Sequence, residues 1–105
     1  MLKKKNLKNR PICKVTFYLP AAIQAETVHL VGDFNEWDEN ATPMKQLKDG
    51  RFTVELELET GQQYQFRYLV DQNEWHNDWE ADKYVPNPFS GDNSVVITWH
   101  WGCIQ

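Results

Sequence analysis

The sequence has little that a catalytic centre or a metal site would need. Its histidines, His29, His76 and His100, are scattered, and its two cysteines, Cys13 and Cys103, lie far apart, so neither set has a metal-ligand spacing. Its many carboxylates form no marked pair, and it contains neither a serine or cysteine nucleophile motif nor a phosphate-binding glycine loop. We therefore expect a chain that is not an enzyme and that holds no metal or cofactor.

The sequence also lacks a basic surface and a long apolar run. Its net charge is −4, and its only basic cluster lies within residues 1–11. Nucleic acid attracts proteins with a positive face, and a membrane-spanning helix needs about 20 apolar residues, so we expect neither partner. The apolar residues after the basic cluster alternate as in a strand, which argues against a signal peptide. We expect a cytoplasmic protein in which residues 1–11 form a flexible basic tail. In that setting both cysteines would stay reduced, although they would meet if the first and last strands were neighbours.

What the sequence has in abundance is aromatic residues and short alternating segments. Five Trp, four Tyr and five Phe are many for 105 residues, a length that suits one domain. The clearest segment is 52–59, in which apolar and polar residues alternate as in a half-buried antiparallel strand. Further strands are predicted at residues 12–19, 25–31, 43–47, 64–71 and 94–99, with an extended segment at 84–89. This pattern predicts an all-β fold: an immunoglobulin-like antiparallel β-sandwich of about seven strands over residues 12–100, with a tail at 101–105.

Two tryptophans stand where a strand runs into a polar loop. Trp37 follows the strand at 25–31 and a run of turn-forming residues, and Trp75 closes the turn after the strand that carries Arg67. Two exposed indole rings near a guanidinium suit a sugar, whose C–H faces stack on aromatic rings and whose hydroxyls need fixed donors. The alternative is that both rings fold back and cap the end of the sandwich, because Trp is usually largely buried.

Three segments, taken in order, resemble one known family. Residues 32–37, Gly-Asp-Phe-Asn-Glu-Trp, resemble the G-x-F-N-x-W signature of carbohydrate-binding module family 48. Residues 66–71 resemble its Y-K-F-x-V-D strand, and residues 92–96 resemble its closing strand. The family includes the glycogen-binding domains of AMP-activated protein kinase β-subunits and is related to the N-terminal domains of isoamylases and glycogen-branching enzymes. The resemblance covers residues 14–98, nearly the whole chain.

This resemblance implies an early-set immunoglobulin-like fold and binding of α-1,4-linked glucans such as glycogen or starch. It places the family's two stacking tryptophans at Trp37 and Trp75 and its binding lysine at Arg67. It places the sugar-binding asparagine at Asn93 and the residue that reaches into the glucan at Phe89. Arginine in place of lysine keeps the charge and changes the donor geometry. The turn before Trp75 is one residue longer than in the kinase subunits, so the direction of its ring stays open.

The sequence therefore predicts a non-catalytic module that binds an α-glucan polysaccharide or malto-oligosaccharide in a surface groove, alone or with a protein partner that acts on glycogen. The remaining tryptophans, Trp79, Trp99 and Trp101, are expected to be mainly structural. The alternative is a protein–protein interaction module that keeps the fold and not the sugar. An exposed edge strand, at residues 43–47 or 12–19, would then pair with a partner.

Overall fold

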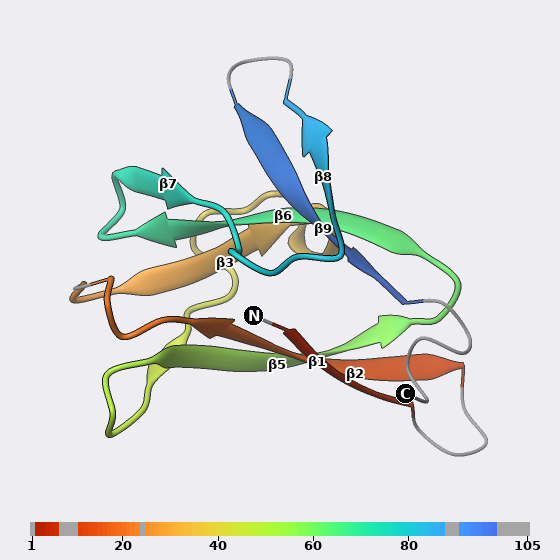
Figure 1. Cartoon of the computed structure of the whole chain (residues 1–105), viewed down its shortest axis with the longest axis horizontal. Coiled ribbons are helices and arrows are strands. Elements are labelled where there is room, and N and C mark those ends of the chain that lie inside the picture. The colour runs from red at the N-terminus through yellow and green to blue at the C-terminus, as the bar shows by residue number, and fades with distance from the viewer. Residues whose placement is uncertain (1, 7–10, 24, 88–90, 99–105) are drawn as a thin grey trace.

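The chain folds as two antiparallel sheets that lie face to face (Figure 1). The computed structural model describes residues 2–6, 11–23, 25–87 and 91–98. The elements are β1 (Leu2–Asn6), β2 (Ile12–Leu19), β3 (Val28–Gly32), the 3₁₀ turn η1 (Asp33–Asn35), β4 (Lys45–Gln46), β5 (Phe52–Glu59), β6 (Gln63–Val70), β7 (Glu74–His76), β8 (Lys83–Pro86) and β9 (Asp92–Ile97). The predicted all-β, immunoglobulin-like sandwich is confirmed.

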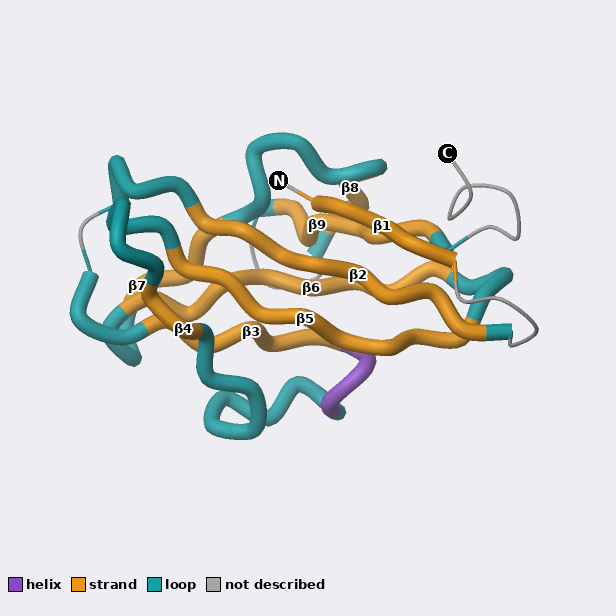
Figure 2. The backbone as a smooth tube through the Cα atoms, turned by 90° about the horizontal axis from the view of Figure 1, so that it is seen from below, coloured by secondary structure: helices purple, strands orange, loops and turns teal. Residues whose placement is uncertain are grey.

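Each sheet joins strands that are distant in the sequence. One sheet has the order β1-β2-β5-β4, and the other has the order β3-β6-β9-β8, with β7 paired to the end of β6. Figure 2, seen from below, shows the first sheet in front of the second, so each sheet turns one face toward the other. None of the described residues belongs to a helix with the length and apolar character needed to cross a membrane.

Alternation along the strands places the apolar side chains between the two sheets. Phe17 lies opposite Val54 in one sheet, and Tyr68 lies opposite Leu30 in the other. The rings of Phe17 and Phe66 meet edge to face across the core, with centroids 5.1 Å apart. The buried members of this core are Cys13, Val15, Phe17, Leu19, Val28, Leu30, Met44, Phe52, Leu58, Phe66, Tyr68, Val70 and Val96.

The N-terminal lysines form a strand instead of a tail. β1 pairs along its whole length with β2. Lys3 and Lys5 are exposed, whereas Leu2 and Lys4 are half-buried, and Lys4 Nζ forms an ion pair with Asp82. Lysine is common on edge strands because its charge discourages pairing with another chain. The prediction of a flexible tail is therefore wrong for Leu2–Asn6, because an edge strand rich in lysine looks like a solvated tail in sequence.

Two more strands replace segments that we predicted as turn or irregular chain. β7 pairs with the end of β6, and β8 pairs with β9 as a sheet edge that ends at Pro86. The strand at 12–19 is an interior strand and not an edge, since β1 covers one side of it. β4, within the predicted strand at 43–47, is an edge strand of two residues.

The described residues leave the C-terminal predictions open. Trp99, Trp101, Cys103 and the tail at 101–105 lie outside them. Cys13 is fully buried and is disulfide-bonded, so the expectation that both cysteines stay reduced is wrong for Cys13. That expectation depended only on the inferred cellular compartment, which the residues themselves do not determine.

Candidate functional site

The turn that carries Trp37 begins at Gly32, and any other residue there would force neighbouring atoms of β6 to move. Gly32 is extended, with a φ of −175°, so its backbone conformation would suit any residue. A Cβ atom there would lie 2.5 Å from the Gln65 carbonyl oxygen and 2.8 Å from Phe66 Cβ. Gly32 is therefore required for the close approach of β3 to β6.

Two residues of η1 hold this turn against the sandwich. The Phe34 ring packs on Phe17 and Phe66, with centroid separations of 5.7 Å and 6.5 Å. The side chain of Asn35 accepts a hydrogen bond from the Gly32 N–H at 3.0 Å and donates from Nδ2 to the Leu30 carbonyl oxygen at 2.8 Å. The turn is thus held in place by the packing of the Phe34 ring and by the hydrogen bonds of the Asn35 side-chain amide.

The carboxylate of Asp33 positions the Trp37 indole. Asp33 Oδ1 accepts a hydrogen bond from Trp37 Nε1 at 2.8 Å, and Asp33 Oδ2 accepts one from the Gln65 backbone N–H at 2.7 Å. Glu36 and Trp37 both have a φ of 57°, a left-handed conformation that costs about 1–2 kcal/mol per non-glycine residue. The hydrogen bond from the Trp37 N–H to the Gly32 carbonyl oxygen, at 2.9 Å, closes the turn in this conformation. The ring of Trp37 is half-buried and fixed by its own nitrogen.

The second sheet presents its outer face beside this turn. We use "outer face" for the side of the β3–β6–β9–β8 sheet that points away from the core. Phe66 and Tyr68 point into the core, so the residues that alternate with them in β6 lie on the outer face. Residues directly opposite these in the register share their face. The outer face therefore includes Val31, Gln65, Arg67, Leu69, Trp75, Asn93 and Val95.

Asn93 and Gln65 form a fixed polar pair on the outer face. Asn93 Nδ2 donates to Gln65 Oε1 at 3.0 Å, and Asn93 Oδ1 accepts from Asn87 Nδ2 at 3.0 Å. Asn93 is only 5% exposed, so its amide orients its neighbours from below the surface. Gln65 also donates its backbone N–H to Asp33, which links this pair to the turn that carries Trp37.

Arg67 and Trp75 stack on one another in the same face. The guanidinium carbon of Arg67 lies 5.9 Å from the centroid of the Trp75 ring, a cation–π contact. Arg67 Nε is buried and has no hydrogen-bond partner among the residues that the structure describes. Trp75 lies opposite the buried Leu69 and keeps 40% of its surface exposed. The ring therefore neither caps the core nor stands free of the protein.

The exposed apolar side chains are of one kind. Within the described parts of the chain, the large apolar side chains classed as exposed are Trp75, Trp79 and Tyr84, at 40%, 62% and 43%. Each is an aromatic residue with a polar atom, and each lies between residue 75 and residue 84, after β6. Aliphatic side chains on the outer face, Val31, Leu69 and Val95, are instead buried. This pattern favours a ligand that meets aromatic rings over one that meets an aliphatic surface.

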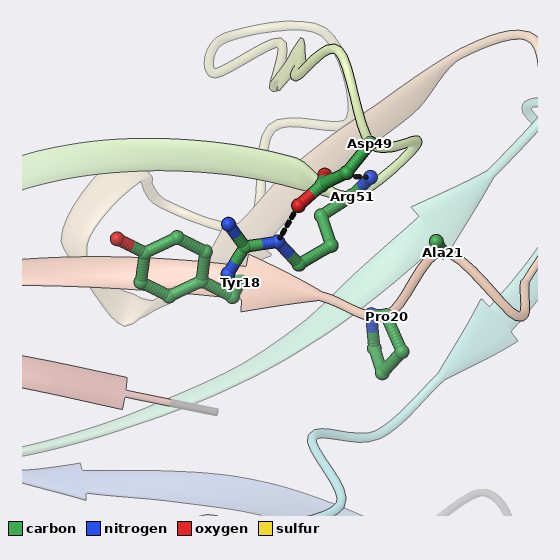
Figure 3. Close-up of a pocket in the computed structure, with 5 residues that line it drawn as sticks. All are labelled: Tyr18, Pro20, Ala21, Asp49 and Arg51. Carbon is green, nitrogen blue, oxygen red and sulfur yellow. Dashed lines mark hydrogen bonds and ion pairs between the residues drawn. The ribbon is translucent and has the colours of Figure 1, made fainter.

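A cavity of about 260 Å³ lies elsewhere, at the end of the first sheet. Figure 3 shows the residues that line it, Tyr18, Pro20, Ala21, Asp49 and Arg51. Arg51 lies over the Tyr18 ring at 5.1 Å and donates from Nε to Asp49 Oδ2 at 2.8 Å. The Arg51 backbone N–H and then its guanidinium hold the pKa of Asp49 below its ordinary value. This cavity shares no lining residue with the turn of Trp37 or with the outer face.

The structure brings together most of the predicted site residues. Arg67, Trp75 and Asn93 share the outer face, and Trp37 is tied to Gln65 of that face through Asp33. Phe89 lies outside the described residues. Sequence reasoning missed Asp33 and Gln65 as positioning residues, although both lie beside residues that it singled out. In the described part of the chain, no group of three His, Cys, Asp or Glu side chains is placed to hold a metal ion.

The fold indicates the structural class of this domain, and the comparison with known families identifies the family. An antiparallel sandwich of short strands in two sheets is a β-sandwich domain of the immunoglobulin-like class. The chain belongs to the carbohydrate-binding module 48 family (isoamylase N-terminal domain), whose model matches residues 8–89. The predicted family is confirmed, and with it a non-catalytic carbohydrate-binding role at the level of the family.

Three curated relatives are named 1,4-alpha-glucan branching enzyme. The chain is 36% identical over 98 residues to that of Aquifex aeolicus, which covers 84% of this chain and 15% of the relative. It is 34% identical over 69 residues to that of Butyrivibrio fibrisolvens, covering 66% of this chain and 11% of the relative. It is 40% identical over 62 residues to that of Photobacterium profundum, covering 58% and 8%. The chain therefore spans less than a sixth of the length of these relatives.

Proposed function

We propose that this chain is a non-catalytic module that binds α-1,4-linked glucans, such as glycogen, starch or malto-oligosaccharides, on the outer face. Trp37 and Trp75 stack on the C–H faces of glucose units, and Arg67 donates hydrogen bonds to their hydroxyls. Gln65 and Asn93 line the same face as a fixed pair of amides. The family and the names of the relatives support this ligand class.

The contact between Arg67 and Trp75 is the observation that carries this proposal. A guanidinium 5.9 Å from the ring centroid orients the indole and leaves 40% of the Trp75 residue exposed to a ligand. Both side chains are thus ordered before the sugar arrives, which lowers the entropy cost of binding. The buried Leu69 lies opposite Trp75 in the β6–β7 register and gives it an apolar neighbour on the same face.

The expected affinity is modest, because an open sheet face buries little of its ligand. We expect a dissociation constant for a short malto-oligosaccharide between about 1 mM and tens of μM, or about −4 to −6 kcal/mol. Several modules on one branched polymer would hold more strongly by avidity. We further propose that the module brings a protein or domain that acts on glucan to its substrate, as the length of the relatives suggests.

The test is calorimetric titration with maltoheptaose and migration through a gel that contains glycogen. Trp75→Ala and Trp37→Ala are each expected to remove binding at the outer face, so that the heat of binding and the retardation both fall strongly without unfolding of the protein. Tyr18→Ala serves as the matched control, because it removes an aromatic ring from the opposite sheet. Wild-type binding by both tryptophan variants would refute this site.

The edges of the two sheets argue against the alternative function, pairing with a partner strand. β1 carries three consecutive lysines, β8 ends at Pro86, and β4 has only two residues. The remaining edge, β3, is covered by residues 42–44, which form backbone hydrogen bonds with Val28 and Leu30. Charged, proline-containing or very short edges are the usual protection against strand addition. The interior position of the strand at 12–19 removes one of the two edges on which that alternative depended.

A further inference from the structure

A second aromatic surface lies apart from the outer face, on the segment between β7 and β8. Trp79 is 62% exposed, more than any other large apolar residue in the described part of the chain. We predicted a mainly structural role for Trp79, and this exposure does not fit a ring that packs. An indole this exposed offers a ring face on which a ligand could stack.

The chain passes to the other side of the sheet between Trp75 and Trp79. The Asp78 backbone N–H donates to Ser94 Oγ at 2.9 Å, and Ser94 lies opposite the core residue Phe66. Asp78 Oδ2 accepts from Tyr68 Oη at 2.7 Å, and Tyr68 is also a core residue. Figure 1 shows the segment leaving β7, passing below β9 in that view, and then rising into β8. Asp78, the neighbour of Trp79 in the sequence, is therefore held on the core side of this sheet, whereas Trp75 lies on the outer face.

The segment that presents Trp79 is held firmly in place. Asp78 is 2% exposed, and its Oδ1 accepts a hydrogen bond from the Glu80 N–H at 2.8 Å. Tyr84 Oη donates to the Asp78 carbonyl oxygen and accepts from the Ala81 N–H, so one phenol ties both sides of Trp79. Burial and the adjacent Asp78 raise the pKa of Tyr68 well above its ordinary value, which keeps its hydroxyl a donor. The indole is thus presented by a preorganised frame.

The surroundings of Trp79 suit a polyhydroxylated ligand better than a protein. Glu80 is an exposed carboxylate, and Tyr84 is 43% exposed. A protein hot spot needs packed apolar side chains around its anchor to exclude water, and among the described residues no large aliphatic side chain is exposed. A sugar needs an aromatic face with hydrogen-bond acceptors at its rim.

We propose that Trp79, with Tyr84 and Glu80, forms a second α-glucan contact site, independent of the outer face. This inference rests on the proposed function for its ligand class. Two sites on different faces let one module bridge neighbouring chains of a branched polymer. The second site should then add little to binding of a short oligosaccharide at the outer face and much to retention on glycogen, through effective concentration.

The experiment follows the indole N–H signals by NMR while maltoheptaose is added. Each signal is assigned with single Trp→Phe variants. We expect the signals of Trp75 and Trp79 both to shift, and we expect the Trp79 shift to persist in Trp75→Ala. Trp79→Ala should leave the oligosaccharide affinity of the outer face unchanged and weaken retention on a glycogen gel about tenfold or more. Glu57→Ala, a change at an exposed residue of β5 in the other sheet, is the control.

The outcomes separate this inference from the proposed function. If the Trp75 signal shifts and the Trp79 signal does not, the second site is refuted and the outer-face site stands. Wild-type retention of both Trp79→Phe and Trp79→Ala on the glycogen gel would also refute the second site. A Trp79 shift that disappears in Trp75→Ala would refute its independence. If only the Trp79 signal shifts, the second site stands and the outer-face site fails.

Discussion

Replacing Asp33 with alanine should disorder Trp37 without removing it. The Asp33 carboxylate is the acceptor for the indole N–H at 2.8 Å and for the Gln65 N–H at 2.7 Å. Alanine at this position takes away both acceptors and leaves the indole attached to a turn with two left-handed residues. The ring then samples orientations in which it no longer faces a ligand.

The size of the effect follows from these contacts. Hydrogen bonds to a charged group contribute about 1.5–3 kcal/mol each when well shielded. Because Asp33 is exposed, we expect a combined loss of about 1–2 kcal/mol in unfolding free energy. Ordering one large side chain on binding costs about 0.5–1.5 kcal/mol, so the dissociation constant for maltoheptaose should rise about two- to tenfold.

Thermal unfolding and calorimetric titration together test this prediction. Asp33→Asn keeps one acceptor oxygen and should give an intermediate result in both assays. A fully folded Asp33→Ala protein with the wild-type dissociation constant would show that Trp37 needs no support from Asp33. That result would refute the reasoning even if Trp37→Ala abolished binding.

Two further predictions concern the frame on which the rings are held. Gly32→Ala should lower the unfolding free energy by about 1–3 kcal/mol, because its Cβ would lie 2.5 Å from a backbone carbonyl oxygen of β6; an unchanged denaturation midpoint would contradict this. Tyr68→Phe removes a donor from the buried Asp78 and should cost about 1–3 kcal/mol, seen as a lower melting temperature. Tyr68→Phe should also speed amide exchange between β7 and β8, and exchange at the wild-type rate would show that this bond does not hold the segment.

The sequence predicted the strands whose side chains alternate most regularly. In β5 and β6, period-two alternation coincides with burial at Phe52, Leu58, Phe66 and Tyr68, because one face of each strand meets the other sheet. β1 was missed because lysines that protect an edge have the same composition as a tail. Only the structure distinguishes β1 from a tail, because it shows that Leu2 and Lys4 are half-buried while Lys3 and Lys5 are exposed.

The sequence predicted the candidate binding residues but not the residues that hold them in position. Trp37 and Trp75 stood out because each follows a strand. The roles of Asp33 and Gln65 depend on a hydrogen bond between residues 32 positions apart, and only the register of β3 with β6 creates it. The exposure of Trp79 likewise depends on Asp78, whose partners belong to β6 and β9. Long-range pairing of this kind leaves no local pattern in the chain.

The amide of Asn35 has a consequence for how this turn can vary in length. Besides its bonds to β3, Asn35 Nδ2 donates to Thr42 Oγ1 at 2.9 Å, and the Leu30 N–H donates to the Thr42 carbonyl oxygen at 2.9 Å. Residues 39–41 lie between these fixed ends and are exposed. Extra residues inserted there would extend into solvent, while Trp37, already fixed upstream, keeps its position. The length of this loop and the position of Trp37 are therefore separable, so the loop can vary in length while the indole stays in place.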